Sequence, residues 1–453
     1  MSSERAWLAI AWTAAVVGVA LRAFAARGDL WLDELWSLAL LEPAQSALDV
    51  FLKIHHDNNH YLSSLWLWAL GGGAAPLLYR LPAVLSGFGL VTLAIAAPFA
   101  RAPAAVGVTA VLLAGSRFLV HYGSEARGYG LAMCFALACY VSLERWLAGE
   151  RRVWAAAFAA AACLGVLSHL TFVFVLAAAF AWVGFEGVRR RRVDFAGLAL
   201  VVTPALLVAG LWWVDVRHSQ VGGAPVTPIW DTVRELTRTT FGLPEGLFEL
   251  AALPFLALAG WELVSLARAR DSRAVFLLAL FVAPVVSYFV WRPDYALPRH
   301  FGVLVPFVLL LAGAGLVRLG PAVTALALAV FLAGNAVQLT ALLRDGRGRY
   351  GDALRFMLER GTSHNAAIGG FNDFRNPLVL DDQIRRQGAQ SRVIYTDLTS
   401  APALTPEWIL VIDGHEHPEG PPTFERAGRT YEFAAVFPYA GLSGWSWLVY
   451  RLR

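Results

Sequence analysis

Two adjacent carboxylates in this sequence lie among aromatic side chains. Asp33 and Glu34 directly follow an apolar segment and are flanked by Trp31 and Trp36. Tryptophan favours the membrane–water interface, whereas a carboxylate gains nothing from that depth. A carboxylate at such a place can act as a general base, taking the proton of an acceptor hydroxyl as its oxygen attacks a sugar carbon. The alternative is a structural role in capping a short helix at residues 34–40.

A polar segment further along the chain collects imidazole, carboxylate and amine groups. Its members are Lys53, His55, His56, Asp57, His60 and Tyr61. Imidazole and carboxylate ligands suit zinc or manganese, so His55, His56 and Asp57 are candidates for a divalent metal site. The two adjacent histidines lack the i, i+4 spacing of a helical metal site. The same groups can instead hydrogen-bond a sugar or a phosphate, and this alternative stays open.

Two arginines lie at junctions between apolar segments. Arg127 follows Glu125 in a short polar turn, and its planar guanidinium can pair with a phosphate. A structural ion pair between Glu125 and Arg127 is the alternative. Arg299 and His300 open a later apolar segment, where the N-terminus of a helix attracts anions. An interfacial anchor is the alternative role of Arg299.

One further histidine is isolated between two apolar segments. His169 has no polar neighbour except Ser168 and Thr171. Polar side chains within a membrane are costly and often functional, so His169 is a candidate for a substrate-binding hydrogen bond.

The composition restricts the class of protein that can carry these groups. The chain has 453 residues, of which 58% are hydrophobic and 15% are charged. Its mean hydropathy of +0.56 is too high for a soluble globular protein of this length. The net charge of +4 comes from arginines scattered between apolar runs rather than from a basic stripe, which argues against nucleic-acid binding.

The apolar runs predict a polytopic membrane protein. A spanning helix needs about 20 mostly apolar residues, and this rule gives about eleven spans. They cover residues 7–24, 79–99, 104–121, 129–147, 153–168, 171–188, 195–214, 248–266, 274–290, 301–316 and 322–343.

Arginine in the short loops predicts the orientation of these spans. Positively charged loops face the cytoplasm, and one choice of orientation gathers almost all the loop arginines on one side. These are Arg101, Arg145, Arg151, Arg152, Arg189 to Arg192, Arg268, Arg270, Arg273 and Arg318. The N-terminus is then cytoplasmic, and all the candidate site residues face the outside.

The end of the chain changes character. From residue 344 it becomes more polar, with an amphipathic helix at residues 352–358 and short strand-like runs at 392–395, 408–412, 431–437 and 445–450. We expect a membrane domain at residues 1–343, with a first external loop at 29–80, and a small extracytoplasmic α/β domain at 344–453. The expected fold class is an all-α polytopic membrane domain with this α/β domain appended.

The order of the polar motifs resembles the GT-C superfamily of glycosyltransferases, in its protein O-mannosyltransferase and aminoarabinose-transferase-like branch. The matching motifs are the Asp33-Glu34 pair, the segment ending His60-Tyr61-Leu62, Arg80-Leu81-Pro82, Ser124-Glu125-Ala126-Arg127 with Tyr129, His169, and Arg299-His300. Together they extend over most of the membrane domain.

The resemblance implies an inverting transfer from an undecaprenyl- or dolichyl-phosphate sugar, with Asp33 as the catalytic acid/base. It also implies basic residues that hold the lipid phosphate, for which Arg127, Arg299 and Lys53 are the candidates. The remaining candidates for substrate binding are His55, His56, Asp57, His60, Tyr61, Glu125, His169 and His300. The chain departs from the family where a His-Pro-Pro-like segment and an Arg-Tyr pair are common, which leaves the sugar and the acceptor open.

The sequence therefore predicts a glycosyltransferase of the cell inner (plasma) membrane. Its expected partners are a polyprenyl-phosphate sugar, an extracytoplasmic lipid, glycan or protein acceptor, and the membrane lipids. The motifs identify no certain cofactor, and a divalent metal at His55, His56 and Asp57 stays an open alternative. A transporter or flippase, and an oligosaccharide ligase or polymerase, are the alternative functions.

Overall fold

The structure of the chain is a computed structural model that describes residues 3–97, 102–191, 194–222, 227–244, 248–291, 296–362, 364–371 and 374–453. Arg101 and Arg192, which contribute to the expected orientation, lie outside the described residues. The chain divides into two compact units. The first contains Met1–Phe24, Pro43–Ala69 and Tyr79–Gln338, and the second contains Ala25–Glu42, Leu70–Leu78 and Leu339–Arg453.

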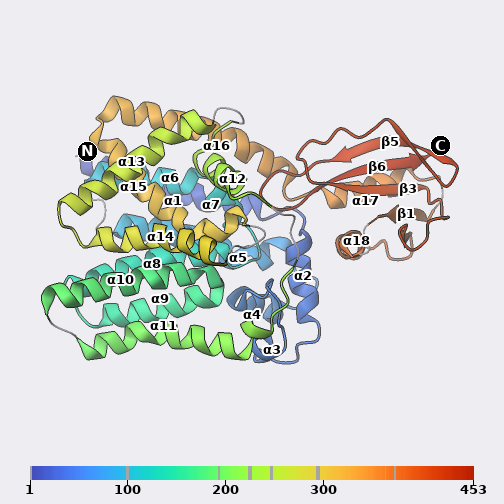
Figure 1. The fold of residues 1–453 in the computed structure, drawn as a ribbon. Coiled ribbons are helices and arrows are strands. Elements are labelled where there is room, and N and C mark those ends of the chain that lie inside the picture. Colours follow the sequence, from blue (N-terminus) through green and yellow to red (C-terminus); the bar gives the residue numbers. More distant parts are fainter. Residues whose placement is uncertain are drawn as a thin grey trace. The chain divides into compact units, whose positions relative to one another are not determined.

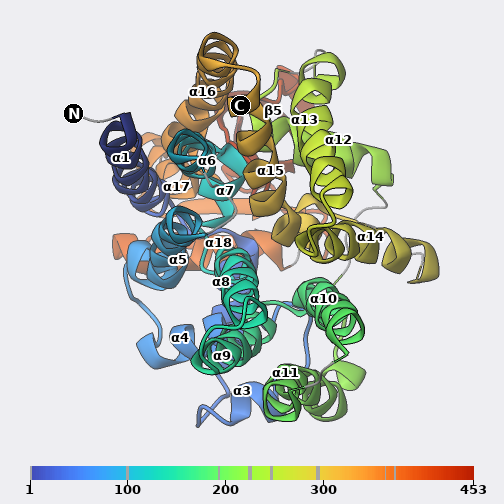
Figure 2. The same ribbon diagram turned by 90° about the vertical axis from the view of Figure 1, so that its left-hand side faces the viewer.

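Long apolar helices build the first unit, and each of the eleven expected spans is helical. They are α1 (Ser3–Ala25), α5 (Pro76–Ala96), α6 (Pro103–Gly115) with α7 (Arg117–Tyr122), α8 (Tyr129–Leu147), α9 (Val153–Ser168), α10 (Val173–Arg190), α11 (Phe195–Val214), α13 (Phe248–Arg268), α14 (Arg273–Trp291), α15 (Val305–Arg318) and α16 (Pro321–Asp345). Three of them begin at a proline, whose missing N–H costs nothing in the first turn. Helices α8 to α11 lie side by side (Figures 1 and 2).

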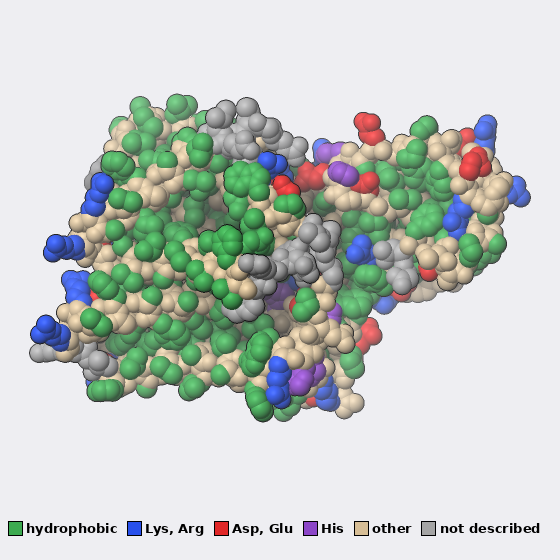
Figure 3. Space-filling model, viewed as in Figure 1, with side chains coloured by type: hydrophobic (Ala, Val, Ile, Leu, Met, Phe, Trp, Pro, Cys, Tyr) green, Lys and Arg blue, Asp and Glu red, His purple; other side chains and the backbone are tan. Residues whose placement is uncertain are grey.

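Within the described part of the chain, eight helices are long and apolar enough to cross a membrane. Helices α6 and α9 are shorter apolar helices of the same kind. Large apolar side chains are exposed on the outward faces of the long helices, for example Leu206 on α11 and Phe289 on α14. Hydrophobic side chains cover most of the helical part in Figure 3, and several Lys and Arg side chains lie along its left edge. The protein is therefore a multi-pass membrane protein.

Shorter helices connect the long ones. They are α3 (Asp49–Leu52), α4 (Tyr61–Leu70), the 3-10 turns η1 (Leu170–Phe172), η2 (Val216–His218) and η3 (Pro298–Leu304), and α12 (Ile229–Phe241). Helix α4 directly follows the histidine-rich segment. The turn η3 contains Arg299 and His300, so the expected helix at residues 301–316 begins with a 3-10 segment.

The expected span at residues 104–121 is broken at Ser116, where the backbone is extended. The N–H of Arg117 donates to Oδ1 of Asn335 over 2.7 Å instead of continuing the helix. A buried arginine, Arg22, donates from Nη2 to the Leu113 carbonyl over 3.2 Å and so satisfies an acceptor that the break releases. These partners come from distant parts of the chain, so a local hydropathy pattern could not reveal the break.

The second unit contains a six-stranded mixed sheet in the order β2-β1-β3-β6-β5-β4. Its strands are β1 (Ala366–Gly370), β2 (Val393–Asp397), β3 (Trp408–Asp413), β4 (Thr423–Arg426), β5 (Arg429–Phe437) and β6 (Ser446–Leu452). Strand β1 pairs in parallel with β2 and β3, whereas the other neighbours are antiparallel. Ile409, Tyr431 and Leu448 belong to its buried core.

Three helices accompany this sheet in the second unit. They are α2 (Leu32–Leu41), α17 (Tyr350–Arg360), which contacts β5 and β6, and α18 (Arg375–Gln387), which contacts α2. The expected amphipathic helix and four strand-like runs are confirmed. Three elements of this unit were not predicted. Strand β1 consists of small residues with two glycines, strand β4 has only four residues, and helix α18 is mostly polar.

Candidate active site

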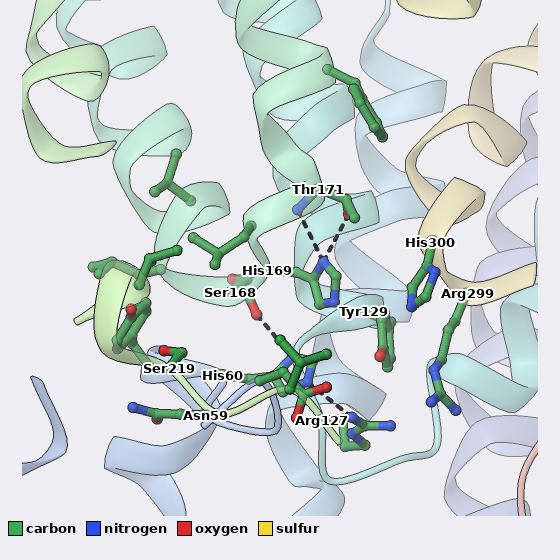
Figure 4. Close-up of a pocket in the computed structure, with 18 of the residues that line it drawn as sticks. Asn59, His60, Arg127, Tyr129, Ser168, His169, Thr171, Ser219, Arg299 and His300 are labelled. Carbon is green, nitrogen blue, oxygen red and sulfur yellow. Dashed lines mark hydrogen bonds between the residues drawn. The ribbon is translucent and has the colours of Figure 1, made fainter. Parts of the chain in front are cut away.

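Polar residues from several helix ends meet around one cavity of the first unit, with a volume of about 620 Å³. Figure 4 shows this cavity with His169 at its centre, between α9 and η1. The polar side chains that line it are His56, Asp57, Asn59, His60, Tyr61, Arg127, Tyr129, Ser168, His169, Thr171, Asp215, Ser219, Ser287, Tyr288, Arg299 and His300. Eight of the residues predicted from the sequence as phosphate- or substrate-binding therefore line one cavity, namely Arg127, Arg299, His56, Asp57, His60, Tyr61, His169 and His300.

Gly128, just before α8, allows the start of α8 to lie close to the end of α9 at this cavity. Gly128 precedes α8 and approaches the end of α9 so closely that a Cβ atom on it would lie 1.7 Å from the Ser168 carbonyl oxygen. The same Cβ atom would lie 2.9 Å from Nδ1 of His60. Only a residue without a side chain permits this approach, which brings Arg127 beside the segment that carries His169.

Arg127 is almost completely buried, with 5% of its surface exposed. Its Nη2 atom donates to Oδ1 of Asn58 over 2.6 Å and lies 3.2 Å from Nε2 of His60. The guanidinium carbon lies 5.0 Å from the centre of the Tyr129 ring, within the range of a cation–π contact. These contacts hold the planar cation at the wall of the cavity, where its guanidinium faces any bound anion.

Two histidines that line the cavity, His60 and His169, have lowered pKa values. Burial, reinforced by the positive charge of Arg127, lowers the pKa of His60 well below its ordinary value. Burial also lowers the pKa of His169, and His300 and Arg127 act in the same direction. The Nδ1 atom of His169 accepts hydrogen bonds from the Thr171 hydroxyl and backbone N–H over 2.7 and 3.1 Å, so the proton of the ring resides on Nε2.

A second polar network lies at the end of α11 and was not predicted. Asp215 is 2% exposed and accepts hydrogen bonds from the Tyr61 hydroxyl over 2.5 Å, from Nδ1 of His55 over 2.7 Å and from the Ser219 hydroxyl over 3.1 Å. Its signal in the sequence was an acid that closes a long apolar run. That signal is weak, because capping and solvated acids also occur at such places.

The histidine-rich segment is divided among different partners. His55 pairs with Asp215, whereas His56 contacts Oδ1 of Asp57 over 2.9 Å. Burial opposes ionisation of Asp57, but hydrogen bonds from His56 and the Gly222 backbone outweigh it and lower the pKa of Asp57. Among the described residues, no three His, Cys, Asp or Glu side chains are grouped so that they could hold a metal ion.

Other candidates lie away from the cavity lining. Lys53 pairs with Asp49 over 2.9 Å, and 61% of its side chain is exposed. Glu125 is completely buried and is not among the cavity residues. Asp33 and Glu34 belong to the second unit, in the first turn of α2. Glu34 is 1% exposed, and its Oε2 accepts the Trp31 backbone N–H over 3.2 Å, which agrees with the capping alternative for this acid.

Solved structures share this fold, although no family model matches the sequence and no curated protein matches it. ArnT from Cupriavidus metallidurans in the apo state aligns with a TM-score of 0.57 at 15% identity, over 90% of this chain and 93% of that one. The same protein bound to undecaprenyl phosphate gives a TM-score of 0.53 at 16% identity, with the same coverage. The Archaeoglobus fulgidus oligosaccharyltransferase in the apo form gives 0.52 at 11% identity, over 85% of this chain and 64% of that one.

The chain therefore has the fold of the GT-C glycosyltransferases, as the order of its sequence motifs indicated. Within that class it is similar to the aminoarabinose transferase ArnT over nearly the whole length of both chains.

Proposed function

We propose that the protein is a membrane glycosyltransferase that moves a sugar from a polyprenyl-phosphate carrier to an extracytoplasmic acceptor. The observation that carries this proposal is the cavity in which Arg127 and Arg299 accompany the neutral imidazoles of His60 and His169. The fold supports it, because one structure that shares the fold, ArnT, holds undecaprenyl phosphate.

Arg127 and Arg299 bind the phosphate of the donor in this proposal. The bond between the sugar and the phosphate breaks during transfer, and negative charge grows on the phosphate as the lipid phosphate leaves. Cations already in place stabilise this growing charge more than they stabilise the intact donor, which lowers the barrier. His169 can add a hydrogen bond from Nε2–H. Lys53 is not needed, because its amine is paired with Asp49.

Asp33 is the general base of the proposed reaction, and Glu34 positions it or the sugar. The acceptor hydroxyl attacks the anomeric carbon from the face opposite the phosphate, and Asp33 takes its proton. This single displacement inverts the configuration at the anomeric carbon. The reaction takes place on the extracytoplasmic side of the plasma membrane if the arginine-rich loops are cytoplasmic.

Purified protein in nanodiscs tests the proposal with undecaprenyl phosphates that carry different sugars. We expect tight binding of undecaprenyl phosphate itself, and Arg127→Ala should weaken it by about 1.5–3 kcal/mol if the contact is direct. Arg189→Ala is the matched control, since Arg189 is 56% exposed and pairs with Glu186. Equal affinity in wild type and Arg127→Ala, with both proteins folded, would assign Arg127 a structural role only.

Transport of intact donor across the membrane is the result that would favour the flippase alternative. Transfer from a diphosphate-linked oligosaccharide, with none from a monophosphate-linked sugar, would favour a ligase or polymerase. Both assays use the same reconstituted protein, so the three functions can be separated in one preparation.

A further inference from the structure

The part of the cavity around Asp215 differs in chemistry from the part around the arginines. Removing a carboxylate from water is costly unless hydrogen bonds compensate it. Asp215 has this compensation from Tyr61, His55 and Ser219, which belong to two separate segments of the chain. Backbone hydrogen bonds of 3.0 Å between these segments, from Asp57 to Gln220 and from Gln220 to His55, hold them together.

Hydrogen-bond accounting shows what this region can offer to a ligand. A carboxylate only accepts, with about four lone-pair positions. Three positions on Asp215 are used by its three donors, which leaves one. The hydroxyls of Tyr61 and Ser219 each donate their one hydrogen to Asp215, so their oxygens can only accept from a ligand. Asp215, Tyr61 and Ser219 all line the cavity.

Asn59 adds another acceptor at the same side. It is 9% exposed and lines the cavity. Its Nδ2 atom donates to the carbonyls of Val50 and Ile54 over 2.8 and 2.9 Å, which occupies both of its hydrogens. Its Oδ1 atom is buried and has no hydrogen-bond partner among the described residues. Figure 4 places Asn59 and Ser219 on one side of the cavity, and Arg299 and His300 on the other.

We propose that Asp215, Tyr61, Ser219 and Asn59 form the subsite that recognises the hydroxyl groups of the donor sugar. This inference rests on the proposed function and assigns the orientation of the donor within the cavity. Phosphate oxygens of the donor only accept, so they are excluded from the Asp215 side and directed to the N–H groups of Arg127 and Arg299. A sugar hydroxyl has a hydrogen to give, and the Asp215 side needs donors.

The arrangement also makes the subsite selective among sugars. A site built to bond a hydroxyl rejects an analogue that lacks it, because the buried acceptor is then left without a partner. A deoxy sugar should therefore bind more weakly only if its missing hydroxyl is the one that meets this subsite. Asp215 is thus assigned as a specificity-determining residue.

The test compares the affinity of undecaprenyl phosphate with that of undecaprenyl phosphates bearing arabinose, glucose or mannose. Wild type should bind at least one of the sugar-bearing donors more tightly than undecaprenyl phosphate. Asp215→Asn should weaken that donor about 10-fold to 100-fold, the range for a lost hydrogen bond to a charged group. It should leave the affinity for undecaprenyl phosphate unchanged within twofold.

Monodeoxy versions of the preferred donor locate the contact. One of them should bind more weakly to wild type, and the same change should make no difference to Asp215→Asn. Asp49→Asn is the matched control. Asp49, at the start of α3, is also a largely buried acid, but it bonds Lys53 and the Gln45 backbone and does not line the cavity. Tyr61→Phe provides a second variant of the subsite if Asp215→Asn does not fold.

Equal weakening of sugar-bearing and sugar-free lipid by Asp215→Asn would overturn the subsite, and so would unchanged affinity for both. Wild type that binds undecaprenyl phosphate without preferring any of the three sugar-bearing donors would also overturn it while leaving the phosphate site intact. Failure of wild type to bind any of these lipids would overturn the proposed function itself.

Discussion

The Nη2 atom of Arg127 lies 3.2 Å from Nε2 of His60, so the guanidinium has a neutral imidazole rather than a second cation beside it only while His60 is unprotonated. A second proton on the ring would make it a cation and place two positive charges 3.2 Å apart. The pair therefore connects Arg127, the proposed phosphate-binding arginine, to the protonation state of a buried histidine.

This contact predicts how stability changes with pH. In the unfolded chain histidine binds a proton near pH 6.5, whereas burial lowers the pKa of His60 in the folded protein. The unfolded state thus binds more protons as the pH falls below about 6.5, so the free energy of unfolding should decrease there. His60→Gln should make this decrease shallower. Thermal unfolding in detergent between pH 7.5 and pH 5 measures it, and identical slopes for both proteins would contradict the assignment.

A second prediction concerns the close approach of α8 to α9. Gly128→Ala places a methyl group against the Ser168 carbonyl, and a backbone atom cannot move aside as a side chain can. We expect a loss of about 1–3 kcal/mol in the free energy of unfolding, typical of overpacking, together with weaker binding of undecaprenyl phosphate. Gly184→Ala on α10 is the control, because a Cβ atom there meets nothing within 4 Å. Equal stability of the two variants would show that the approach is looser than described.

The third prediction concerns the segment before Arg299. The Thr232 hydroxyl of α12 donates to the carbonyl of Ala296, three residues before Arg299. Thr232→Val keeps the shape but leaves a buried carbonyl unsatisfied, at a cost of about 1–3 kcal/mol. Because Arg299 is then less firmly placed, the KM for the lipid donor should rise more than kcat falls.

Thr237→Val is the matched control for this prediction. Its hydroxyl donates to the carbonyl of Val233 within the same helix, so its loss should change neither constant appreciably. Similar kinetics in the Thr232 and Thr237 variants would remove α12 from the positioning of Arg299.

The long apolar helices could be predicted from the sequence because each apolar run is long enough to carry its own signal. The polar candidates were recognisable for a related reason. Arg127, His169 and Arg299 interrupt apolar sequence, and such interruptions occur where helices end and a membrane protein exposes polar groups to a cavity.

The rest of the site depends on contacts between distant residues. Asp215 gains its significance from Tyr61, which is 154 positions away. The break at Ser116 depends on Asn335, which is 218 positions from Arg117. No local pattern contains these pairs, so neither the Asp215 side of the cavity nor the broken helix could be predicted. Asp33 and Glu34 were identified from their neighbours alone, and their role stays a prediction.

Single-turnover transfer by Asp33→Asn tests the central claim most directly. The change keeps nearly the same size but removes the proton acceptor from a step that typically gains about 10²–10⁴-fold from such a group. We expect Asp33→Asn to bind the sugar-bearing undecaprenyl phosphate as wild type does while the release of undecaprenyl phosphate slows by that factor, and Glu34→Gln to slow it less. Transfer by folded Asp33→Asn within a few-fold of the wild-type rate would contradict the account.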